Sequence, residues 1–216
     1  QRQCQSQAPA GTERPARVER RRLVALVAEL DLLHPTEDTS TLLQQALSSA
    51  QASLQARGAH VALAERAELL AYFGHPVARE QAPRDAAEAA LDLAAAWQPL
   101  GALSWRVGLH VGWSHGSSDA NRPDEAGTLA REARRLAWQA PARGLVLGPT
   151  LQRRMHNHFQ LGMLAGPDAP APALLLGRRP LPAQPQASEP QPPRLLGRQS
   201  ELAQLTQLWQ QVDRKS

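Results

Sequence analysis

Apolar residues gather first in segments whose patterns are typical of β-strands. The run between Val24 and Leu33 is mostly apolar and lies between three arginines and a His-Pro pair, which predicts a buried strand. Between His60 and Gly74, two short apolar runs flank the charged tip Arg66-Ala67-Glu68, and this arrangement predicts a β-hairpin. Apolar and polar residues alternate from Trp105 to Val111, which predicts a further strand.

Helical spacing of apolar residues marks the segments between these strands. Thr39 or Ser40 can cap a first helix, which ends before Gly58. Pro83 and Asp85 open a second helix. The apolar positions that share one face are Leu42, Leu43, Ala46, Leu47, Ala50 and Leu54 in the first helix, and Ala86, Ala89, Ala90, Leu93 and Trp97 in the second.

Shorter elements are expected in the remainder of this region. The pattern predicts a loop from Trp113 to Asp124, a third helix over roughly Thr128–Gln139, a strand at Leu145–Leu147, a helical turn over Leu151–Asn157 and a last strand at Leu174–Leu176. The order β-α-β-β-α-β predicts an α/β sandwich of the α+β, ferredoxin-like type. Its sheet is expected to be mostly antiparallel, with the helices packed on one face.

Composition divides the chain into four parts. Residues 1–20 are rich in Gln, Arg, Pro and Ala and predict a disordered lead-in. Residues 21–177 hold the elements above and predict one domain. Residues 178–193 contain six prolines, which predicts a stiff, extended linker. Residues 194–216 have too little apolar surface for a domain of their own, so they predict the start of a further module.

Charge and composition narrow the classes of partner. The chain has 216 residues, of which 42% are apolar, and a formal charge of +4. Lys215 is the only lysine, so arginine supplies nearly all of the positive charge. Arginine suits phosphate binding, but no basic stripe with interleaved aromatic residues indicates a nucleic-acid site. Nucleic acid is therefore not an expected partner.

The sequence also argues against several site types and against a membrane segment. Cys4 is the only cysteine, which excludes an internal disulfide and a cysteine-based zinc site. His156 and His158 lie two residues apart without clustered carboxylates, so no histidine metal site is expected. No apolar run reaches 18 residues, and residues 1–20 do not resemble a signal peptide. We expect a soluble, cytoplasmic protein, or a soluble part of one.

Four sequence blocks occur in a fixed order between residues 20 and 176. They are RRLVALVAEL at 21–30, HVALAERAELLAYFGHPVA at 60–78, WRVGLHVG at 105–112 and GTLAREARRL at 127–136. In order and spacing the blocks resemble bacterial class III adenylate/guanylate cyclase homology domains. The third block resembles their Arg-Ile-Gly-Ile-His-Thr-Gly strand, and the fourth their Gly-x-x-Val-Asn-x-Ala-x-Arg-Leu helix. The resemblance implies the cyclase fold and a homodimer or heterodimer formed through the cyclase-type interface.

A second, shorter resemblance lies beyond the proline-rich segment. The residues Gly197-Arg198-Gln199-Ser200-Glu201-Leu202 are similar to the Gly-Arg-Glu-x-Glu-Leu box that opens AAA/STAND-type ATPase modules. Such modules often follow cyclase domains in large bacterial regulators. The resemblance implies a downstream ATPase module as a partner in the same chain.

The cyclase resemblance implies a metal site at two positions. Two aspartates of the family hold two divalent ions, which activate the ribose 3′-oxygen for attack on the α-phosphate. The first aspartate corresponds to Glu29, whose extra methylene displaces its oxygens. The second corresponds to Ala67, which has no ligand atom. Glu68 is its neighbour, but adjacent strand residues point to opposite faces, so Glu68 is expected to be a poor substitute.

The resemblance also implies positions for transition-state and purine-binding groups. Arg131 replaces the family's asparagine, and Arg135 retains the arginine four residues later on the same helical face. Leu63 replaces the purine-reading lysine. Asp124 matches the purine-reading acid when the count runs back from Gly127 across a shortened loop. The alternatives are an exposed arginine on an arginine-rich helix for Arg135 and an ordinary loop aspartate for Asp124.

These substitutions lead to one main hypothesis and two alternatives. The main hypothesis is a catalytically degenerate cyclase homology domain that acts as a regulatory or dimerisation module of a larger signalling ATPase. One alternative is an active adenylate cyclase whose composite site takes its aspartates from a partner subunit. The other is a nucleotide sensor that binds phosphates through Arg131, Arg134 and Arg135 without turnover. No cofactor is expected, and Mg²⁺ or Mn²⁺ with ATP would bind only if the site is functional.

Overall fold

The structure is a computed structural model that describes residues 20–115, 127–164 and 170–180, together with residues 201, 203, 204 and 209. The elements, in chain order, are β1 (Arg20–Leu32), α1 (Glu37–Ala56), β2 (His60–Glu65), β3 (Glu68–Phe73), α2 (Ala82–Trp97), β4 (Leu103–His115), α3 (Thr128–Gln139), β5 (Gly144–Leu147), α4 (Pro149–Met155), β6 (Phe159–Met163) and β7 (Ala173–Arg178). They all belong to one compact unit, Gln1–Arg179, and Pro180–Ser216 form a second unit. In the second unit, residues 201, 203, 204 and 209 are helical and exposed.

Several predictions from the sequence lie outside the described residues. Asp124 is one of them, and so is nearly all of the lead-in predicted at residues 1–20. The same holds for most of the proline-rich segment at 178–193 and of the module predicted at 194–216. None of the helices in the described ranges combines the length and the hydropathy that crossing a bilayer requires.

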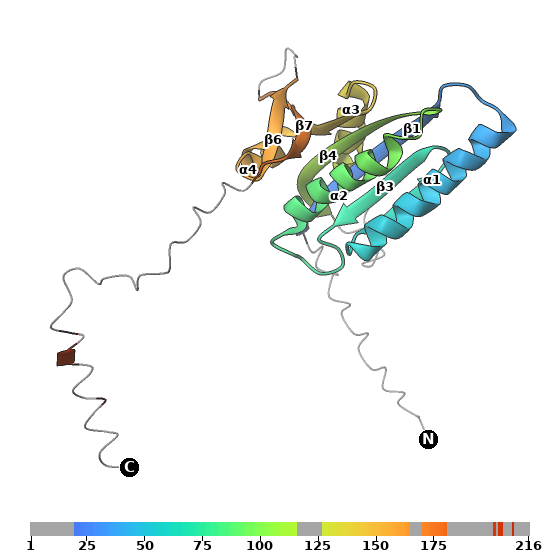
Figure 1. Cartoon of the computed structure of the whole chain (residues 1–216). Helices are drawn as coiled ribbons and strands as arrows, with labels where there is room; N and C mark the ends of the chain where they lie inside the picture. The colour runs from blue at the N-terminus through green and yellow to red at the C-terminus, as the bar shows by residue number, and fades with distance from the viewer. Residues whose placement is uncertain are drawn as a thin grey trace, which may run out of the picture. The chain divides into compact units, whose positions relative to one another are not determined.

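The strands form one seven-stranded sheet with the order β2-β3-β1-β4-β5-β7-β6 (Figure 1). Neighbouring strands are antiparallel except for β4 and β5, which are parallel. Strands β1 to β4 and helices α1 and α2 form a βαββαβ unit whose strand order, 2-3-1-4, is that of ferredoxin-like folds. The predicted fold class is therefore confirmed.

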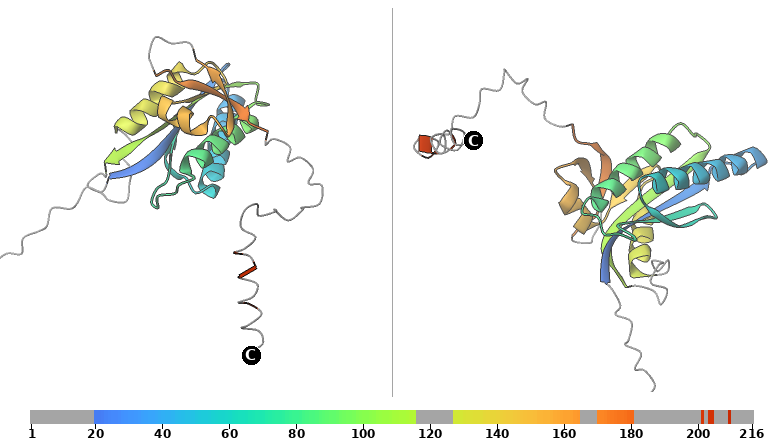
Figure 2. Two further views of the ribbon diagram at one scale, coloured as in Figure 1. Left: turned by 90° about the vertical axis from the view of Figure 1, so that its left-hand side faces the viewer. Right: turned by 90° about the horizontal axis from the view of Figure 1, so that it is seen from below.

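The predicted placement of the helices on one face is correct for α1 and α2 but wrong for α3. Alternate residues of β1 point to opposite faces of the sheet. Val24, Leu26 and Ala28 pack in the core that α1 and α2 cover. Leu23, Ala25 and Val27 pack instead against Leu129, Ala130, Ala133 and Ala137 of α3. The right-hand view of Figure 2 shows α3 across the sheet from α1 and α2.

Close contact between α3 and the sheet depends on small residues on both sides. Ala130, Ala133 and Ala137 are fully buried on the sheet-facing side of α3. Opposite them in β4 lies Gly108, where an added Cβ would come within 2.2 Å of the Ala133 carbonyl oxygen and 2.4 Å of the Ala137 nitrogen. The helix backbone therefore rests directly on the strand, which leaves no room for a side chain at residue 108.

Helix α1 begins earlier than predicted. Thr36, rather than Thr39 or Ser40, is its N-cap, and the Thr36 hydroxyl accepts a hydrogen bond from the Thr39 backbone N–H at 3.2 Å. The Thr39 hydroxyl in turn accepts one from the Thr36 N–H at 2.7 Å, which completes a capping box with threonine in place of the usual acid. At the other end, Gly58 has the predicted helix-ending role and a positive φ of 77°.

Two further sequence predictions need correction. β4 continues to His115, so the loop predicted from Trp113 begins as strand. The register places Trp113 opposite Arg22 in the long ladder between β4 and β1. The sequence analysis also missed β6, which is only five residues long, contains Gly162 and lies at the edge of the sheet. So short a segment has a weak periodic signal, and pairing with β7 decides its conformation.

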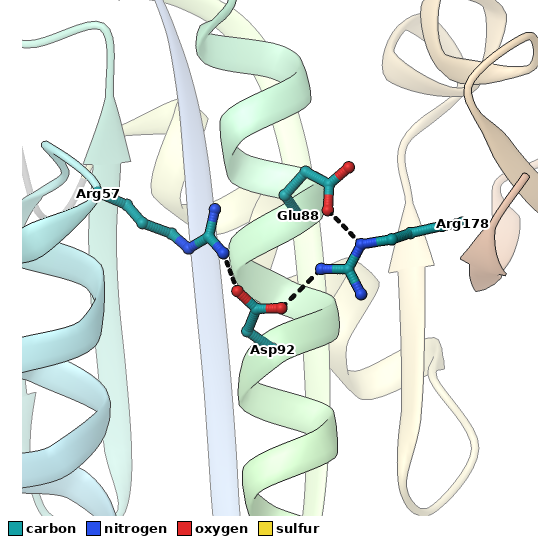
Figure 3. A network of polar contacts seen from close by, with 4 residues as sticks. All are labelled: Arg57, Glu88, Asp92 and Arg178. Carbon is teal, nitrogen blue, oxygen red and sulfur yellow. Dashed lines mark hydrogen bonds and ion pairs between the residues drawn. The ribbon is translucent and has the colours of Figure 1, made fainter. Parts of the chain in front are cut away.

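A network of ion pairs joins the end of β7 to α2 and the end of α1 (Figure 3). The Arg178 guanidinium donates to Glu88 at 2.5 Å and to Asp92 at 2.6 Å, and these hydrogen bonds raise the pKa of Arg178. Asp92 also accepts a hydrogen bond from Arg57, the C-cap of α1. Arg178 is about half exposed, at 52%, so screening by water keeps each pair within about 1 kcal/mol.

Candidate functional site

The two positions that the resemblance assigns to metal ligands lie side by side at one end of the sheet. Glu29 is near the end of β1, and Ala67 is in the turn between β2 and β3. The Leu30 backbone N–H donates to the Ala67 carbonyl at 2.8 Å, which holds the hairpin tip against β1. A surface hollow of about 300 Å³ is lined by both residues, by Leu30, Asp31, Arg66 and Glu68, and by Ser104, Trp105 and Arg106 of β4.

The turn itself brings a methyl group to the second position. Arg66 and Ala67 have φ values of 51° and 68°, so both central residues of the two-residue turn are left-handed. That geometry matches the twist of a tight β-hairpin, although it costs about 1 kcal/mol per residue with a side chain. Asn, Asp and Gly adopt such φ values more readily than Ala does. The hairpin is thus intact, while its tip presents no oxygen ligand at residue 67.

Glu68 lies on the same face of the sheet as Glu29, contrary to the expectation from strand alternation. The antiparallel register places Glu68 directly opposite Glu29, and residues opposite each other in such a pair share a face. Alternation does not relate Glu68 to Ala67, because Ala67 belongs to the turn and not to the strand. The end of the sheet therefore carries a pair of glutamates on adjacent strands.

Two side chains of α3 bind this glutamate pair. The Arg134 guanidinium donates to Glu68 Oε1 through Nε at 2.9 Å and through Nη2 at 2.7 Å. The Trp138 indole N–H donates to Glu29 Oε1. Arg134 and Trp138 are four residues apart and thus share one side of the helix. Because α3 packs on the sheet in this position, side chains of the same chain donate hydrogen bonds to both carboxylates of the pair.

Burial and neighbouring charges shift the pKa values of Glu29 and Arg134. Burial raises the pKa of Glu29 above its ordinary value; the Trp138 hydrogen bond opposes this effect, and the charge of Glu68 adds to it. The hydrogen bond with Glu68 raises the pKa of Arg134, which therefore stays charged. Arg134 and Glu68 are about a quarter exposed, at 26% and 25%, so their ion pair is only partly screened by water.

Of the transition-state and purine-binding positions, Arg131, Arg135 and Leu63 are described, and the structure does not bring them to the glutamate pair. Arg131 is exposed and donates to the Thr128 hydroxyl at 3.2 Å. Arg135 is 48% exposed and donates to Glu132 at 3.0 and 3.1 Å. Leu63 lies on β2 and packs at the margin of the core that α3 covers. None of these residues lines the hollow beside Glu29.

Comparison with solved structures assigns the architecture. No protein-family model and no curated protein matches the sequence. The guanylyl cyclase domain of the RhoGC fusion protein from the aquatic fungus Blastocladiella emersonii is similar, with a TM-score of 0.64 at 14% identity over 74% of this chain and 98% of that chain. The chain has the nucleotide cyclase fold.

Bacterial cyclases are similar to this cyclase-fold chain as well. The adenylyl cyclase CyaB from P. aeruginosa has a TM-score of 0.57 at 14% identity, over 76% of this chain and 97% of that chain. The adenylate/guanylate cyclase/hydrolase from Silicibacter pomeroyi has a TM-score of 0.55 at 16% identity, over 75% and 98%. Identities this low establish the fold alone, so the chemistry has to be argued from the residues of this chain.

The residues of this cyclase-fold domain do not fit the divalent ions that the fold implies. The Ala67 side chain has no ligand atom, and both glutamates accept hydrogen bonds from α3. The Arg134 guanidinium already supplies a positive charge that balances the negative charge of the two carboxylates. Among the residues that the structure describes, no group of three or more His, Cys, Asp or Glu is placed to hold a metal.

Arg134 and Trp138 were not predicted from the sequence as partners of the glutamates. Their four-residue spacing on α3 is visible in the sequence, but Arg134 stands in an arginine-rich run with Arg131 and Arg135. Helical periodicity shows that Arg134 and Trp138 share a side of α3. It does not show that this side faces the hairpin tip, which follows from the packing of α3 on the sheet.

Replacement of Glu29 by glutamine is expected to stabilise the domain at neutral pH. Because the pKa of Glu29 is raised in the folded state, its contribution to stability is present below its unfolded pKa and is lost as the pH rises through the folded pKa. Glutamine keeps the oxygen that accepts from Trp138 without the charge. Glu29→Gln should raise the free energy of unfolding by roughly 0.5 kcal/mol at about pH 8 and leave it unchanged at about pH 4.

Denaturant unfolding at the two pH values measures the effect of Glu29→Gln, and Glu80→Gln is the matched control. Glu80 is exposed and forms no ion pair with a described residue. An equal gain in both variants would assign the effect to net charge rather than to the partly buried environment of Glu29.

Proposed function

We propose that this chain is a catalytically degenerate nucleotide cyclase homology domain. It would serve as a regulatory or dimerisation module, in the cytoplasm, of a larger signalling protein that includes an ATPase module. The single observation that supports the proposal most strongly is that side chains of α3 bind both glutamates of the pair. At the place where the fold family holds metal, Arg134 binds Glu68, Trp138 binds Glu29 and residue 67 is alanine.

The expected free energy of activation argues against turnover by this domain. Cyclisation in the resembling family depends on two metal-holding aspartates and on an asparagine and an arginine that stabilise the transition state. Of these four groups, only Arg135 is retained. Each factor of ten in rate corresponds to ~1.4 kcal/mol, so the loss of a metal site together with a transition-state group removes several kcal/mol of barrier lowering.

A regulatory role is supported by what the domain retains. The described strands and helices keep the cyclase architecture, and one similar structure is described as a non-canonical dimeric guanylyl cyclase domain from Blastocladiella emersonii. A domain that keeps such a fold without its chemistry still offers a surface for a second cyclase-type domain. The downstream ATPase module is supported by the Gly197–Leu202 motif alone.

Two arms test the proposal. The purified domain, with ATP or GTP and either Mg²⁺ or Mn²⁺, is expected to form cyclic nucleotide no faster than a protein-free blank. In a Mn²⁺ titration by calorimetry, the Glu29→Asp/Ala67→Asp variant should bind at least about ten-fold more tightly than the native domain, because it restores two short carboxylates.

The matched control for that titration is Glu29→Asp/Ala67→Asn. Asparagine tolerates the positive φ of residue 67 as well as aspartate does, but it brings no charge. Cyclic nucleotide formed by the native domain would overturn the proposal. Equal Mn²⁺ affinities of the two double variants would show that the missing carboxylate is not what excludes metal.

The nucleotide-sensor alternative rests on a different observation. A guanylate cyclase domain from Catenaria anguillulae has been solved in complex with GTP, so the fold can hold a nucleotide in that protein. In this chain, however, Arg134 and Arg135 each pair with a carboxylate of the same domain. Calorimetric titration with ATP and GTP in the absence of metal is expected to give no binding heat, and saturable heat would favour the sensor over the regulatory module.

A further inference from the structure

A second group of cationic and ionisable side chains lies at the other end of the hairpin from Ala67. His60 begins β2, and His75 follows β3, so the two residues meet where the hairpin opens. They line a hollow of about 280 Å³ with Gly58, Ala59, Pro76, Val77 and Arg79. An adjoining hollow of about 330 Å³ shares Gly58 and Arg79 with the first. None of these residues belongs to the glutamate site.

The two imidazoles form a fixed wall of the first hollow. Their ring centroids are 4.9 Å apart and their planes are inclined by 69°, an edge-to-face arrangement. His75 is only 9% exposed, so its ring is held by packing rather than by solvent. An imidazole N–H donates hydrogen bonds to oxyanions, and a ring held in place loses little entropy when it does so.

Arg79 supplies a positive charge beside the imidazoles. Its guanidinium lies over Gly58, where an added Cβ would be 2.9 Å from Arg79 Nη1. The glycine that ends α1 therefore also leaves space for this side chain. Arg79 forms no ion pair with any residue that the structure describes, unlike Arg57, Arg134, Arg135 and Arg178.

The charges around the hollow decide between a cation and an anion as its ligand. Two histidines alone are compatible with a transition metal, but Arg79 adds a fixed positive charge to the same wall. Among the described residues that line the two hollows, Asp85 in the second is the only acid. The balance of charge favours an anion.

We propose that His60, His75 and Arg79 form a binding site for a phosphate group, separate from the glutamate pair at the hairpin tip. The guanidinium offers a planar fork of donors that matches phosphate oxygens, and an imidazole N–H is a donor of the same kind. Inorganic phosphate and the phosphate of a small nucleotide share this chemistry. The site does not depend on whether the domain is catalytically active.

The test follows the imidazole C–H signals of His60 and His75 by NMR while inorganic phosphate is added at constant ionic strength. Both signals are expected to shift together and to saturate in the millimolar range, with a Kd that Arg79→Ala raises at least ten-fold, about 1.4 kcal/mol. Arg79→Lys, which keeps the charge without the fork, should retain part of the affinity. A parallel titration with AMP identifies the source, because tighter binding than inorganic phosphate indicates a nucleotide.

The matched control is Arg84→Ala on α2. Arg84 is exposed, lines neither hollow and forms no ion pair with a described residue. Its removal should leave the phosphate affinity unchanged. Three outcomes would overturn the proposal: shifts that do not saturate, equal weakening by Arg79→Ala and Arg84→Ala, or micromolar Zn²⁺ binding at the two histidines without a response to phosphate.

Discussion

Gly108→Ala is expected to destabilise the domain by about 3 kcal/mol, a large share of the roughly 5–15 kcal/mol by which ordinary domains are stable. The added methyl group would lie 2.2 Å from a carbonyl oxygen and 2.4 Å from a backbone nitrogen of α3. Both obstacles are backbone atoms, which cannot move by a change of rotamer. The whole helix would have to lift away from the sheet.

Lifting α3 has a specific consequence for the glutamate pair. Arg134 and Trp138 reach Glu68 and Glu29 only because α3 lies directly on β1 and β4. Any Gly108→Ala protein that still folds should therefore also lose these two contacts. Because the Trp138 indole donates to Glu29 in the native domain, part of its tryptophan fluorescence should follow the titration of Glu29, and the variant should lose this response.

Thermal and denaturant unfolding measure the stability effect, and Gly177→Ala is the matched control. Gly177 also lies in a strand, but an added Cβ there meets nothing within 4 Å. Gly177→Ala should change the free energy of unfolding by no more than about 0.5 kcal/mol. If Gly108→Ala lowers the free energy of unfolding no more than Gly177→Ala does, α3 does not pack on the sheet as described.

Arg134→Ala is expected to cost about 1–2 kcal/mol at about pH 8. Breaking a fully buried ion pair costs about 3–5 kcal/mol, whereas an exposed pair contributes about 0–1 kcal/mol. Arg134 and Glu68 are about a quarter exposed, at 26% and 25%, which places their pair between these limits. The variant also leaves two carboxylates on adjacent strands without the guanidinium that balances them.

The loss in Arg134→Ala should decrease with falling pH. Arg134 lowers the pKa of Glu29, so its removal raises that pKa further above the unfolded value. A raised carboxyl pKa gives stability that is present in acid and lost as the pH rises through the folded pKa. Chemical unfolding from about pH 4 to about pH 8 should therefore show a gap between native and variant that widens with pH.

Arg135→Ala provides the comparison for Arg134→Ala. The two arginines are adjacent on α3, but Arg135 is 48% exposed, and its one ion pair with a described residue is with Glu132, one turn away. Its removal should cost about 0.5 kcal/mol or less, with little dependence on pH. Similar losses from the two variants would mean that Arg134 stabilises the helix and not the glutamate pair.

Much of the fold was predictable because its signals are local. The apolar run of β1, the hairpin from His60 to Phe73 and the periodic faces of α1 and α2 each follow from the side-chain directions of a strand or a helix. Their order then leaves few arrangements other than a βαββαβ unit. The N-cap at Thr36 and strand β6 were missed because capping and edge pairing depend on a few atoms rather than on a long pattern.

The sequence by itself determined most of the elements of this protein, their order and the absence of a side-chain oxygen ligand at residue 67. Only the tertiary structure decided that α3 covers the opposite face of the sheet from α1 and α2 and that Arg134 and Trp138 bind Glu68 and Glu29. The physical reason is that periodicity specifies which side of a helix is apolar but not which face of a sheet it will cover. That choice depends on close packing between distant segments, here Gly108 of β4 against the backbone of Ala133 and Ala137.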